Sequence, residues 1–253
     1  MASVIPLGKS SVRLSQLRRL IGRRSARFAD GLFVIEGPEL VTEALASDLV
    51  VDSVIVPQRG SGELVVGLAL EAGVDVYVLS DALFESTAST KNPQAAMAVA
   101  EMPEVGIGDL DAEDSIVLVL DGIADPGNAG TIVRLAEAVG AAAVVFANAV
   151  DPFNPKTVRS TAGSICRVPV IIDDEPADAL RAAGFRLVGA EGAGDAYDES
   201  DPTGALALVL GSEAHGLSIE CDSYVALPMA GNVESLNVAV AASVLAYDLV
   251  RRR

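Results

Sequence analysis

The carboxyl-terminal half of the chain alternates short, wholly apolar runs with longer segments of helical periodicity. The runs at Ile116–Leu120, Ala142–Phe146 and Leu206–Leu210 contain no charged residue. An uninterrupted apolar run of this length is typical of a strand that is buried on both faces, and such strands occur in parallel sheets covered by helices. The sequence therefore predicts an α/β domain with a mostly parallel sheet and helices on both of its faces.

The amino-terminal part shows the same alternation on a smaller scale. Four leucines and isoleucines at helical spacing predict a helix over residues 11–28, and Phe33–Glu36 follows as a short strand, whereas residues 1–10 are expected to be irregular. Residues 101–114 contain six acids, no base, one proline and two glycines, a composition typical of a linker. We expect a first α/β domain, a linker and a second domain, at residues 1–104, 105–114 and 115–253 respectively.

Composition excludes several classes of protein. Hydrophobic residues make up 51% of the chain, but no run of eighteen apolar residues occurs, so no transmembrane helix is expected. The first thirty residues lack the apolar core of a signal peptide. Cys166 and Cys221 form no CxxC pair and His215 is the single histidine, so we expect no bound metal. The expected setting is a reducing cytoplasm.

The formal net charge of −17 does not favour binding to nucleic acid, but the bases are unevenly distributed. Residues 1–30 contain seven bases and one acid, and the chain ends in three arginines. A one-signed cluster can bind polyphosphate locally, and the alternative is a solvated face of an amphipathic helix. We expect RNA contacts from Arg18, Arg19, Arg23 and Arg24.

Three glycine-containing segments follow one another in the second half of the chain. They read DGIADPGNAGTIVRLAEA at residues 121–138, LVLGSEAHGLS at 208–218 and LPMAGNVESLNVAVA at 227–241. In this order they resemble the motifs of the SpoU/TrmH family of RNA methyltransferases, and three ordered motifs are far more specific than one glycine motif. The amino-terminal pieces LRRLIGRRSARFADGLFVIEGPELVTEAL and TKNPQAAMAVAE resemble the substrate-binding domain often fused to that family.

The resemblance implies a fold and an activity. The fold would be an amino-terminal ribosomal-protein-like α/β sandwich followed by a trefoil-knotted SPOUT domain. The activity would be methyl transfer from S-adenosylmethionine to a ribose 2′-hydroxyl by a homodimer, most often at a guanosine of 23S ribosomal RNA. A transfer RNA target, an RNA site whose methylation confers antibiotic resistance, and a catalytically silent RNA-binding homologue are alternatives. A nucleotide-binding oxidoreductase would show the same alternation, but no GxGxxG follows Ile116–Leu120.

The resemblance also implies the polar residues of the site. They are Arg134, Asn128, Glu213, Ser235 and Asn237. The family proposal makes Arg134 the group that activates the 2′-hydroxyl. Because arginine hardly deprotonates in proteins, we favour a role in binding phosphate and stabilising the developing alkoxide. The alternatives for Asn128 and Ser235 are a turn residue and the cap of a helix that continues to about Val250.

The remaining implied residues are those of the donor pocket and one further cation. By resemblance the pocket is lined by Leu210, Gly211, Leu227, Met229 and Leu236, each of which could otherwise be an ordinary core or turn residue. Arg159, in KTVRSTAG, is a candidate for RNA contact. Asp121 and Asp125 could bind Mg²⁺, but turn capping is the favoured interpretation.

Overall fold

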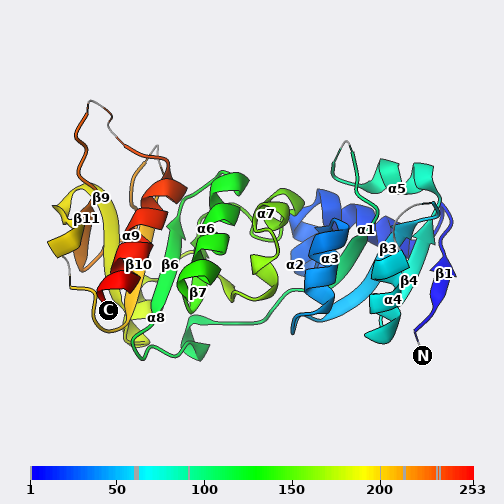
Figure 1. The fold of residues 1–253 in the computed structure, drawn as a ribbon, viewed down its shortest axis with the longest axis horizontal. Helices are drawn as coiled ribbons and strands as arrows, with labels where there is room; N and C mark the ends of the chain where they lie inside the picture. Colours follow the sequence, from blue (N-terminus) through cyan, green and yellow to red (C-terminus); the bar gives the residue numbers. More distant parts are fainter. Residues whose placement is uncertain are drawn as a thin grey trace. The chain divides into compact units, whose positions relative to one another are not determined.

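A computed structural model describes residues 2–59, 63–90, 92–199, 201–212, 215–231, 233 and 235–253 (Figure 1). The chain divides into two compact units, each formed by two stretches of sequence. The first unit contains Met1–Pro103 and Phe153–Arg167, and the second contains Glu104–Pro152 and Val168–Arg253. The described part of the chain has no helix that combines the length and apolarity needed to cross a membrane.

The first unit is built on a mixed sheet with the strand order β1-β4-β3-β5-β2 among the residues that the structure describes. Its strands are β1 (Val4–Pro6), β2 (Leu32–Glu36), β3 (Val51–Pro57), β4 (Asp75–Leu79) and β5 (Met97–Glu101). Strand β5 runs antiparallel to β2 and β3, whereas β4 runs parallel to β1 and β3. The expectation that residues 1–10 are irregular was wrong, because Val4–Pro6 adds an edge strand to β4.

The helical segments of this unit are α1 (Val12–Gly22), α2 (Arg24–Asp30), α3 (Pro38–Leu45), α4 (Glu63–Glu71), α5 (Asp81–Thr87), α7 (Pro155–Ser160) and a 3₁₀ turn η2 (Ser164–Cys166). The single helix expected over residues 11–28 is divided, since Arg23 adopts extended backbone angles. Arg27 explains the break: its side chain is buried, and its Nη1 donates to the Leu20 carbonyl oxygen at 2.6 Å. The Leu20 carbonyl, near the end of α1, thus accepts from a charged side chain instead of from a backbone N–H of a further helical turn.

The second unit is built on six described strands that all run parallel, in the order β11-β9-β10-β6-β7-β8. They are β6 (Ile116–Asp121), β7 (Ala143–Ala147), β8 (Val170–Ile172), β9 (Arg186–Ala196), β10 (Leu206–Gly211) and β11 (Ser223–Ala226). This sheet confirms the predicted fold class. The knot stays a prediction from the resemblance.

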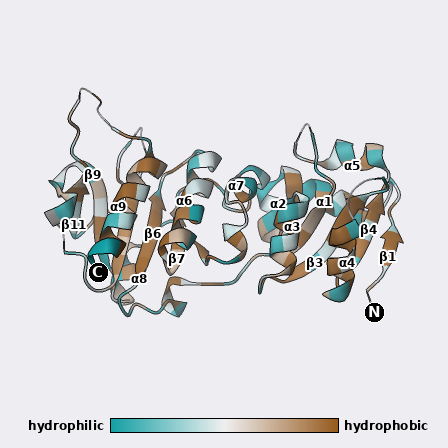
Figure 2. Cartoon of the chain, viewed as in Figure 1, coloured by the Kyte–Doolittle hydropathy of each residue, from teal (hydrophilic) through white to brown (hydrophobic). Residues whose placement is uncertain are grey.

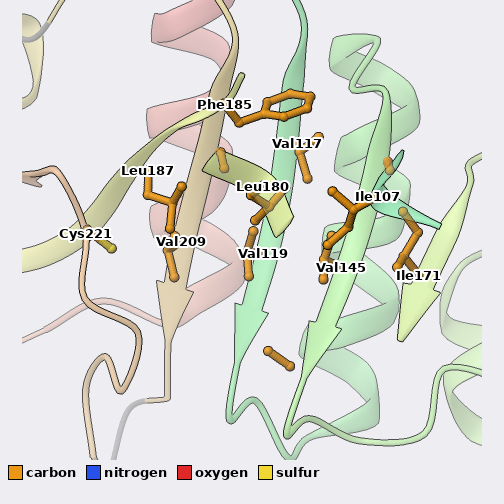
Figure 3. Close-up of a cluster of buried hydrophobic side chains, with 13 residues drawn as sticks. Ile107, Val117, Val119, Val145, Ile171, Leu180, Phe185, Leu187, Val209 and Cys221 are labelled. Atoms are coloured by element: carbon orange, nitrogen blue, oxygen red, sulfur yellow. The ribbon is translucent and has the colours of Figure 1, made fainter. Parts of the chain in front are cut away.

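Helices cover both faces of this sheet. They are α6 (Pro126–Val139), α8 (Ala177–Ala182) and α9 (Val238–Arg252), with 3₁₀ turns η1 (Ile107–Asp109) and η3 (Tyr197–Glu199). Helices α6 and α9 pack side by side on one face, and Figure 3 shows the core cluster that includes Leu180 of α8 on the other face. Strand β6 is mostly hydrophobic (Figure 2), and each of its residues is buried, including Asp121 at its end. Strands buried on both sides explain the wholly apolar runs in the sequence.

Two segments pack against parts of the chain that the sequence did not predict as their partners. Residues 105–114, expected to be a linker, pack on the second unit, where Ile107 is only 5% exposed within the core cluster (Figure 3). Residues 153–167 lie within the expected second domain but join the first unit, where the rings of Phe153 and Phe33 are 4.9 Å apart. In both cases a few apolar side chains find partners that composition alone does not indicate.

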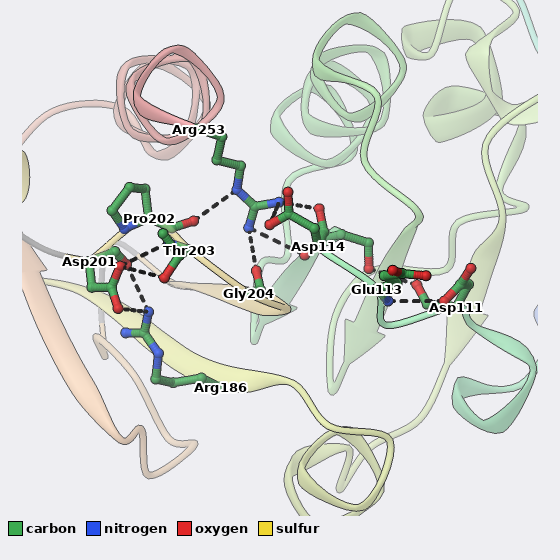
Figure 4. A network of polar contacts seen from close by, with 10 residues as sticks. Asp111, Glu113, Asp114, Arg186, Asp201, Pro202, Thr203, Gly204 and Arg253 are labelled. Carbon is green, nitrogen blue, oxygen red and sulfur yellow. Dashed lines mark hydrogen bonds and ion pairs between the residues drawn. The ribbon is translucent and has the colours of Figure 1, made fainter.

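The last two arginines of the chain are bound within the second unit, and Figure 4 shows the contacts of Arg253. Arg253 donates to the carbonyl oxygens of Pro202, Gly204 and Asp114. Arg252 pairs with Asp248 through Nε at 2.6 Å. Arg252 also donates to the Tyr197 carbonyl oxygen at 2.8 Å, so both cations tie the end of α9 to neighbouring segments.

Candidate functional site

The cavity of interest lies at the carboxyl edge of the parallel sheet, beside the ends of β10 and β11 and the middle of β9, and has a volume of about 420 Å³. Ligands of open α/β sheets bind at this edge because loops from neighbouring strands converge there. All five residues expected to bind the donor line it: Leu210, Gly211, Leu227, Met229 and Leu236. Segments from two of the three sequence motifs therefore meet at one place.

Further lining residues were missed by the sequence analysis. They are Ala190, Glu191 and Gly192 at the end of β9's buried portion, and Val238, Ala241 and Leu245 of α9. Leu210 pairs with Ala190 in the sheet, so this part of β9 must adjoin the glycine that ends β10. The signal that could have found these residues is strand order, which the sequence does not contain.

Gly211 is required at the floor of the cavity by its surroundings. A Cβ at this position would lie 2.8 Å from the Leu217 nitrogen and closer still to the Gly216 carbonyl. Ser212 and Gly216 form an isolated bridge with two backbone hydrogen bonds, so this stretch folds back on itself. Only glycine lets the backbone of the strand approach the returning loop this closely.

Asp121 anchors the same loop from the neighbouring strand. Its carboxylate is 2% exposed and accepts hydrogen bonds from the backbone N–H groups of Ser218 and Ile219, the latter at 2.9 Å. The Ser218 hydroxyl donates to its other oxygen at 2.6 Å. Asp121 therefore holds a loop that lies 97 residues away in the sequence. Asp125, by contrast, caps α6 as expected, accepting from the Asn128 N–H at 2.9 Å.

The starts of α6 and α9 are joined by two amides. Asn237 is the N-cap of α9, and its Oδ1 accepts from the N–H groups of Ala239 and Val240. Its Nδ2 donates to Oδ1 of Asn128 at 2.9 Å. One side chain thus satisfies free N–H groups of a helix start and fixes a second predicted site residue. The structure brings these two residues together.

The other predicted polar residues are distributed differently. Ser235 is exposed and lines the cavity. Arg134 is exposed on α6, is not among the lining residues, and has no hydrogen bond or ion pair with the residues that the structure describes. Glu213 lies outside the described residues. His215 is exposed, and its N–H donates to the Ser212 hydroxyl at 3.1 Å, so its backbone contributes to the shape of the loop.

The cations expected to contact RNA all belong to the first unit. Arg18, Arg19, Arg23 and Arg24 are exposed on α1, α2 and the residue between them. Arg19 pairs with Asp30 at 3.2 Å, and Arg24 lies over the ring of Phe28 at 5.0 Å from its centroid. Arg159, on α7, is held by Glu36 at 3.2 Å and by the Ser89 hydroxyl at 2.6 Å. Four of the five are therefore available at the surface.

The cavity at the sheet edge fits a ligand with an adenosine part. Its volume is within the range of small-molecule sites, its walls are largely apolar, and Gly211 lines it without a side chain. Among the described residues no group of His, Cys, Asp and Glu could hold a metal ion. Burial, with a contribution from nearby Asp222, raises the pKa of the Cys221 thiol to about 11, so this cysteine is poorly suited to act as a nucleophile.

Comparison with known families and proteins identifies the family of the chain. Residues 115–247 match the SpoU rRNA Methylase family, and residues 12–98 match the MRM3-like substrate binding domain. A 23S rRNA (guanosine(2553)-2′-O)-methyltransferase of Bacillus subtilis is 37% identical, covering 89% of this chain and 91% of its own. A 23S rRNA (uridine(2479)-2′-O)-methyltransferase of Streptomyces viridochromogenes is 32% identical, covering 96% of this chain and 91% of its own.

Solved structures support the same assignment. The SpoU methyltransferase AviRb from Streptomyces viridochromogenes, in complex with the cofactor AdoMet, has a TM-score of 0.88 and 31% identity, with 96% of this chain and 98% of that chain covered. An AdoMet-bound rRNA methyltransferase from Sinorhizobium meliloti has a TM-score of 0.87 and 27% identity, with 98% of each chain covered. The predicted enzyme class and cofactor are confirmed at the level of the family. From its motifs, its parallel sheet and these relatives, the chain belongs to the SpoU rRNA methylase family.

Proposed function

We propose that this protein transfers the methyl group of S-adenosylmethionine to a ribose 2′-hydroxyl of 23S ribosomal RNA, in the cytoplasm. The observation that carries the proposal is the cavity at the sheet edge, which is lined by residues of two family motifs, those at 208–218 and 227–241. Asp121, the first residue of the motif at 121–138, binds the loop beside this cavity through the Ile219 N–H. The two relatives above are named for 23S rRNA, which favours that RNA over transfer RNA. A guanosine is the first candidate because the relative with 37% identity is named for one.

The donor would be held by the backbone and the apolar walls of the cavity. Gly211 and Leu227 would offer main-chain hydrogen bonds to its adenine, with Met229 and Leu236 packing on the ring. Holding the donor methyl in line with the ribose oxygen, with water excluded, supplies much of the rate enhancement in such a transfer. Ser235, at the rim, and the paired Asn128 and Asn237 would orient the ribose, as would Glu213.

Arg134 would bind the RNA phosphate and stabilise the developing alkoxide, because a guanidinium is a permanent cation and a very poor base. Its side chain is exposed and does not line the cavity of its own chain. We therefore propose that it acts in the cavity of a second copy of the chain, within a homodimer.

The homodimer is also favoured by the outer surface of α9. This helix exposes a row of apolar side chains, namely Val240, Val244, Tyr247 and Val250, of which Val240 is 50% and Tyr247 is 54% exposed. An exposed apolar row next to a ligand site is typical of a protein interface. Val244→Glu should convert dimer to monomer in sedimentation velocity, whereas the same substitution at the exposed Val12 of α1 should not.

The first unit, and with it residues 1–104, would bind the RNA substrate. Its surface arginines on α1 and α2 fit that role, and each phosphate contact should make binding more sensitive to salt. The experiment that tests the whole proposal is mapping of 2′-O-methyl groups in ribosomal and transfer RNA from cells with and without the gene. Loss of one site in 23S rRNA, restored by the purified enzyme, is the expected result.

Arg134→Ala separates an enzyme from a catalytically silent homologue. We expect transfer to be abolished while donor affinity, measured by calorimetry, stays within a few fold. Wild-type protein that binds RNA and donor but transfers no methyl group to unmodified ribosomal RNA would support the silent alternative. Retained turnover in Arg134→Ala would contradict the role given to this residue.

A further inference from the structure

A second cavity, of about 330 Å³, lies entirely within the first unit. It is formed where β2 ends and α3 begins, together with the loop before β5 and helix α7, and includes Glu36, Gly37 and Arg159. We infer that this cavity is a subsite for one unstacked nucleobase of the RNA substrate. The inference rests on the proposed function, since it assigns part of the RNA to a place in the substrate-binding unit.

One wall of the cavity is fixed before any ligand arrives. The Glu36 carboxylate is 7% exposed and accepts from the N–H and the hydroxyl of Ser89, each at 2.9 Å. Arg159 donates through Nη1 to Glu36 at 3.2 Å and to the Ser89 hydroxyl at 2.6 Å. A charged network that is internally satisfied is rigid, so it can present a surface without reorganising.

The same network leaves part of the guanidinium for a ligand. The hydrogen bonds of Arg159 use only Nη1, and its Nε and Nη2 have no partner among the described residues, while 30% of its side chain is exposed. Unstacked RNA bases commonly lie on the plane of an arginine or bind its free N–H groups. Arg159 can therefore contact RNA even though it is paired with Glu36.

The rest of the cavity lining includes neutral hydrogen-bonding groups. Thr90, Asn92 and Gln94 line it, and they supply both donors and acceptors. Gln94 lies against Gly37, where a Cβ would be 3.1 Å from Oε1 and where φ is +114°. Glycine at this position therefore keeps the carboxamide close to the start of α3.

Charge and shape favour a base over a phosphate. Among the lining residues that the structure describes, the charged ones are Glu36, Glu39 and Arg159, a formal charge of −1, which favours a neutral base over an anion. Leu40, Pro93 and Met97 add apolar surface, on which the flat face of a base can pack. A carboxylate beside amide groups can also accept from the exocyclic amino groups of guanine, adenine or cytosine.

The test uses the full-length protein and unmodified 23S rRNA fragments that contain the methylated site. Asn92→Ala combined with Gln94→Ala should raise the KM for RNA about tenfold, because contacts to one base are typically of this size. We expect kcat within twofold of wild type and an unchanged Kd for S-adenosylmethionine. Gln58→Ala, an exposed amide of the same unit outside the cavity, is the matched control and should leave the KM unchanged.

RNA fragments with single abasic positions identify the base. In filter binding, wild-type protein should bind more weakly when one particular nucleotide is abasic. The double variant should bind that abasic fragment as well as it binds the intact fragment. Additive losses at every abasic position, or an unchanged KM in the double variant, would overturn the inference. A nucleoside monophosphate that stabilises wild type but not the double variant, with equal RNA affinity for both, would overturn it too. Filter binding needs no turnover. A failure of methyl transfer would therefore contradict the proposed function, while the binding data would still test the base subsite.

Discussion

Asp121 provides the sharpest test of how the donor cavity is built. It is the last residue of β6, and its buried carboxylate accepts from the backbone N–H groups of Ser218 and Ile219 and from the Ser218 hydroxyl. Gly216 and Leu217, immediately before these donors, line the cavity. If this carboxylate holds the loop in its binding shape, its removal should weaken donor binding although the residue itself does not line the cavity.

The magnitude follows from the hydrogen bonds. A bond to a charged group contributes about 1.5–3 kcal/mol, and Asp121→Ala removes the acceptor of three donors. Relief of the buried charge offsets part of that loss, so we expect about 3 kcal/mol of destabilisation. Asp121→Asn keeps one oxygen for the two backbone donors, and its amide can donate to the Ser218 hydroxyl, so we expect about 1–2 kcal/mol.

Donor affinity depends on how much of the free protein keeps the loop closed. The apparent Kd equals the intrinsic Kd divided by the fraction of free protein whose loop is closed, and about 1.4 kcal/mol corresponds to a tenfold change. We expect calorimetry with S-adenosylmethionine to give a few-fold weaker binding for Asp121→Asn and more than tenfold weaker binding for Asp121→Ala. The KM for the donor should rise in step, with kcat at saturation close to that of wild type.

Asp222→Asn is the matched control. Asp222 accepts from the Leu187 N–H at 2.8 Å and from Arg181, and it does not line the cavity. This control should lower the free energy of unfolding without changing the Kd for the donor. Equal donor affinities in Asp121→Ala and wild type would refute the reasoning, as would equal losses in Asp121→Ala and the control.

Three further predictions concern other residues of the second unit. Asn237→Ser should keep the cap of α9 but be too short to reach Asn128, so the melting temperature should stay near that of wild type while the kcat for methyl transfer falls at least tenfold. In folded protein at pH 8, Cys221 should resist a thiol reagent, because burial raises its pKa to about 11; rapid reaction of this thiol, scored in Cys166→Ser protein, would contradict that. A backbone N–H at the start of β9 holds the pKa of Asp222 below its usual value, so its stabilisation should be present above about pH 4 and lost as the pH falls through the lowered pKa. Acid denaturation of wild type against Asp222→Asn measures that loss, and parallel pH curves would count against it.

Local pattern was sufficient for much of the fold. The apolar runs predicted the parallel strands of the second sheet because strands buried on both faces need apolar residues at every position. Asp125 was expected to cap a turn, and it caps α6, because capping uses atoms within a few residues. The donor residues came from the family resemblance, and the structure groups all five around one cavity.

Other features depended on contacts that no local pattern contains. The strand β1 was missed because three residues carry almost no periodicity and pair with β4 about seventy residues away. The helix over residues 11–28 was expected to be continuous, since nothing in the pattern shows that Arg27 binds the Leu20 carbonyl.

The sequence by itself determined the family and the α/β class, and it predicted the residues that line the cavity proposed for the methyl donor. Only the tertiary structure decided that Asp121 holds the loop at Ser218, that Arg159 pairs with Glu36, and that residues 153–167 pack with the first unit. The physical reason is that periodicity and capping act over a few residues, whereas these contacts depend on strand order and on which buried polar groups find partners. Those partners lie about one hundred residues apart, and their pairing is settled when the sheets assemble.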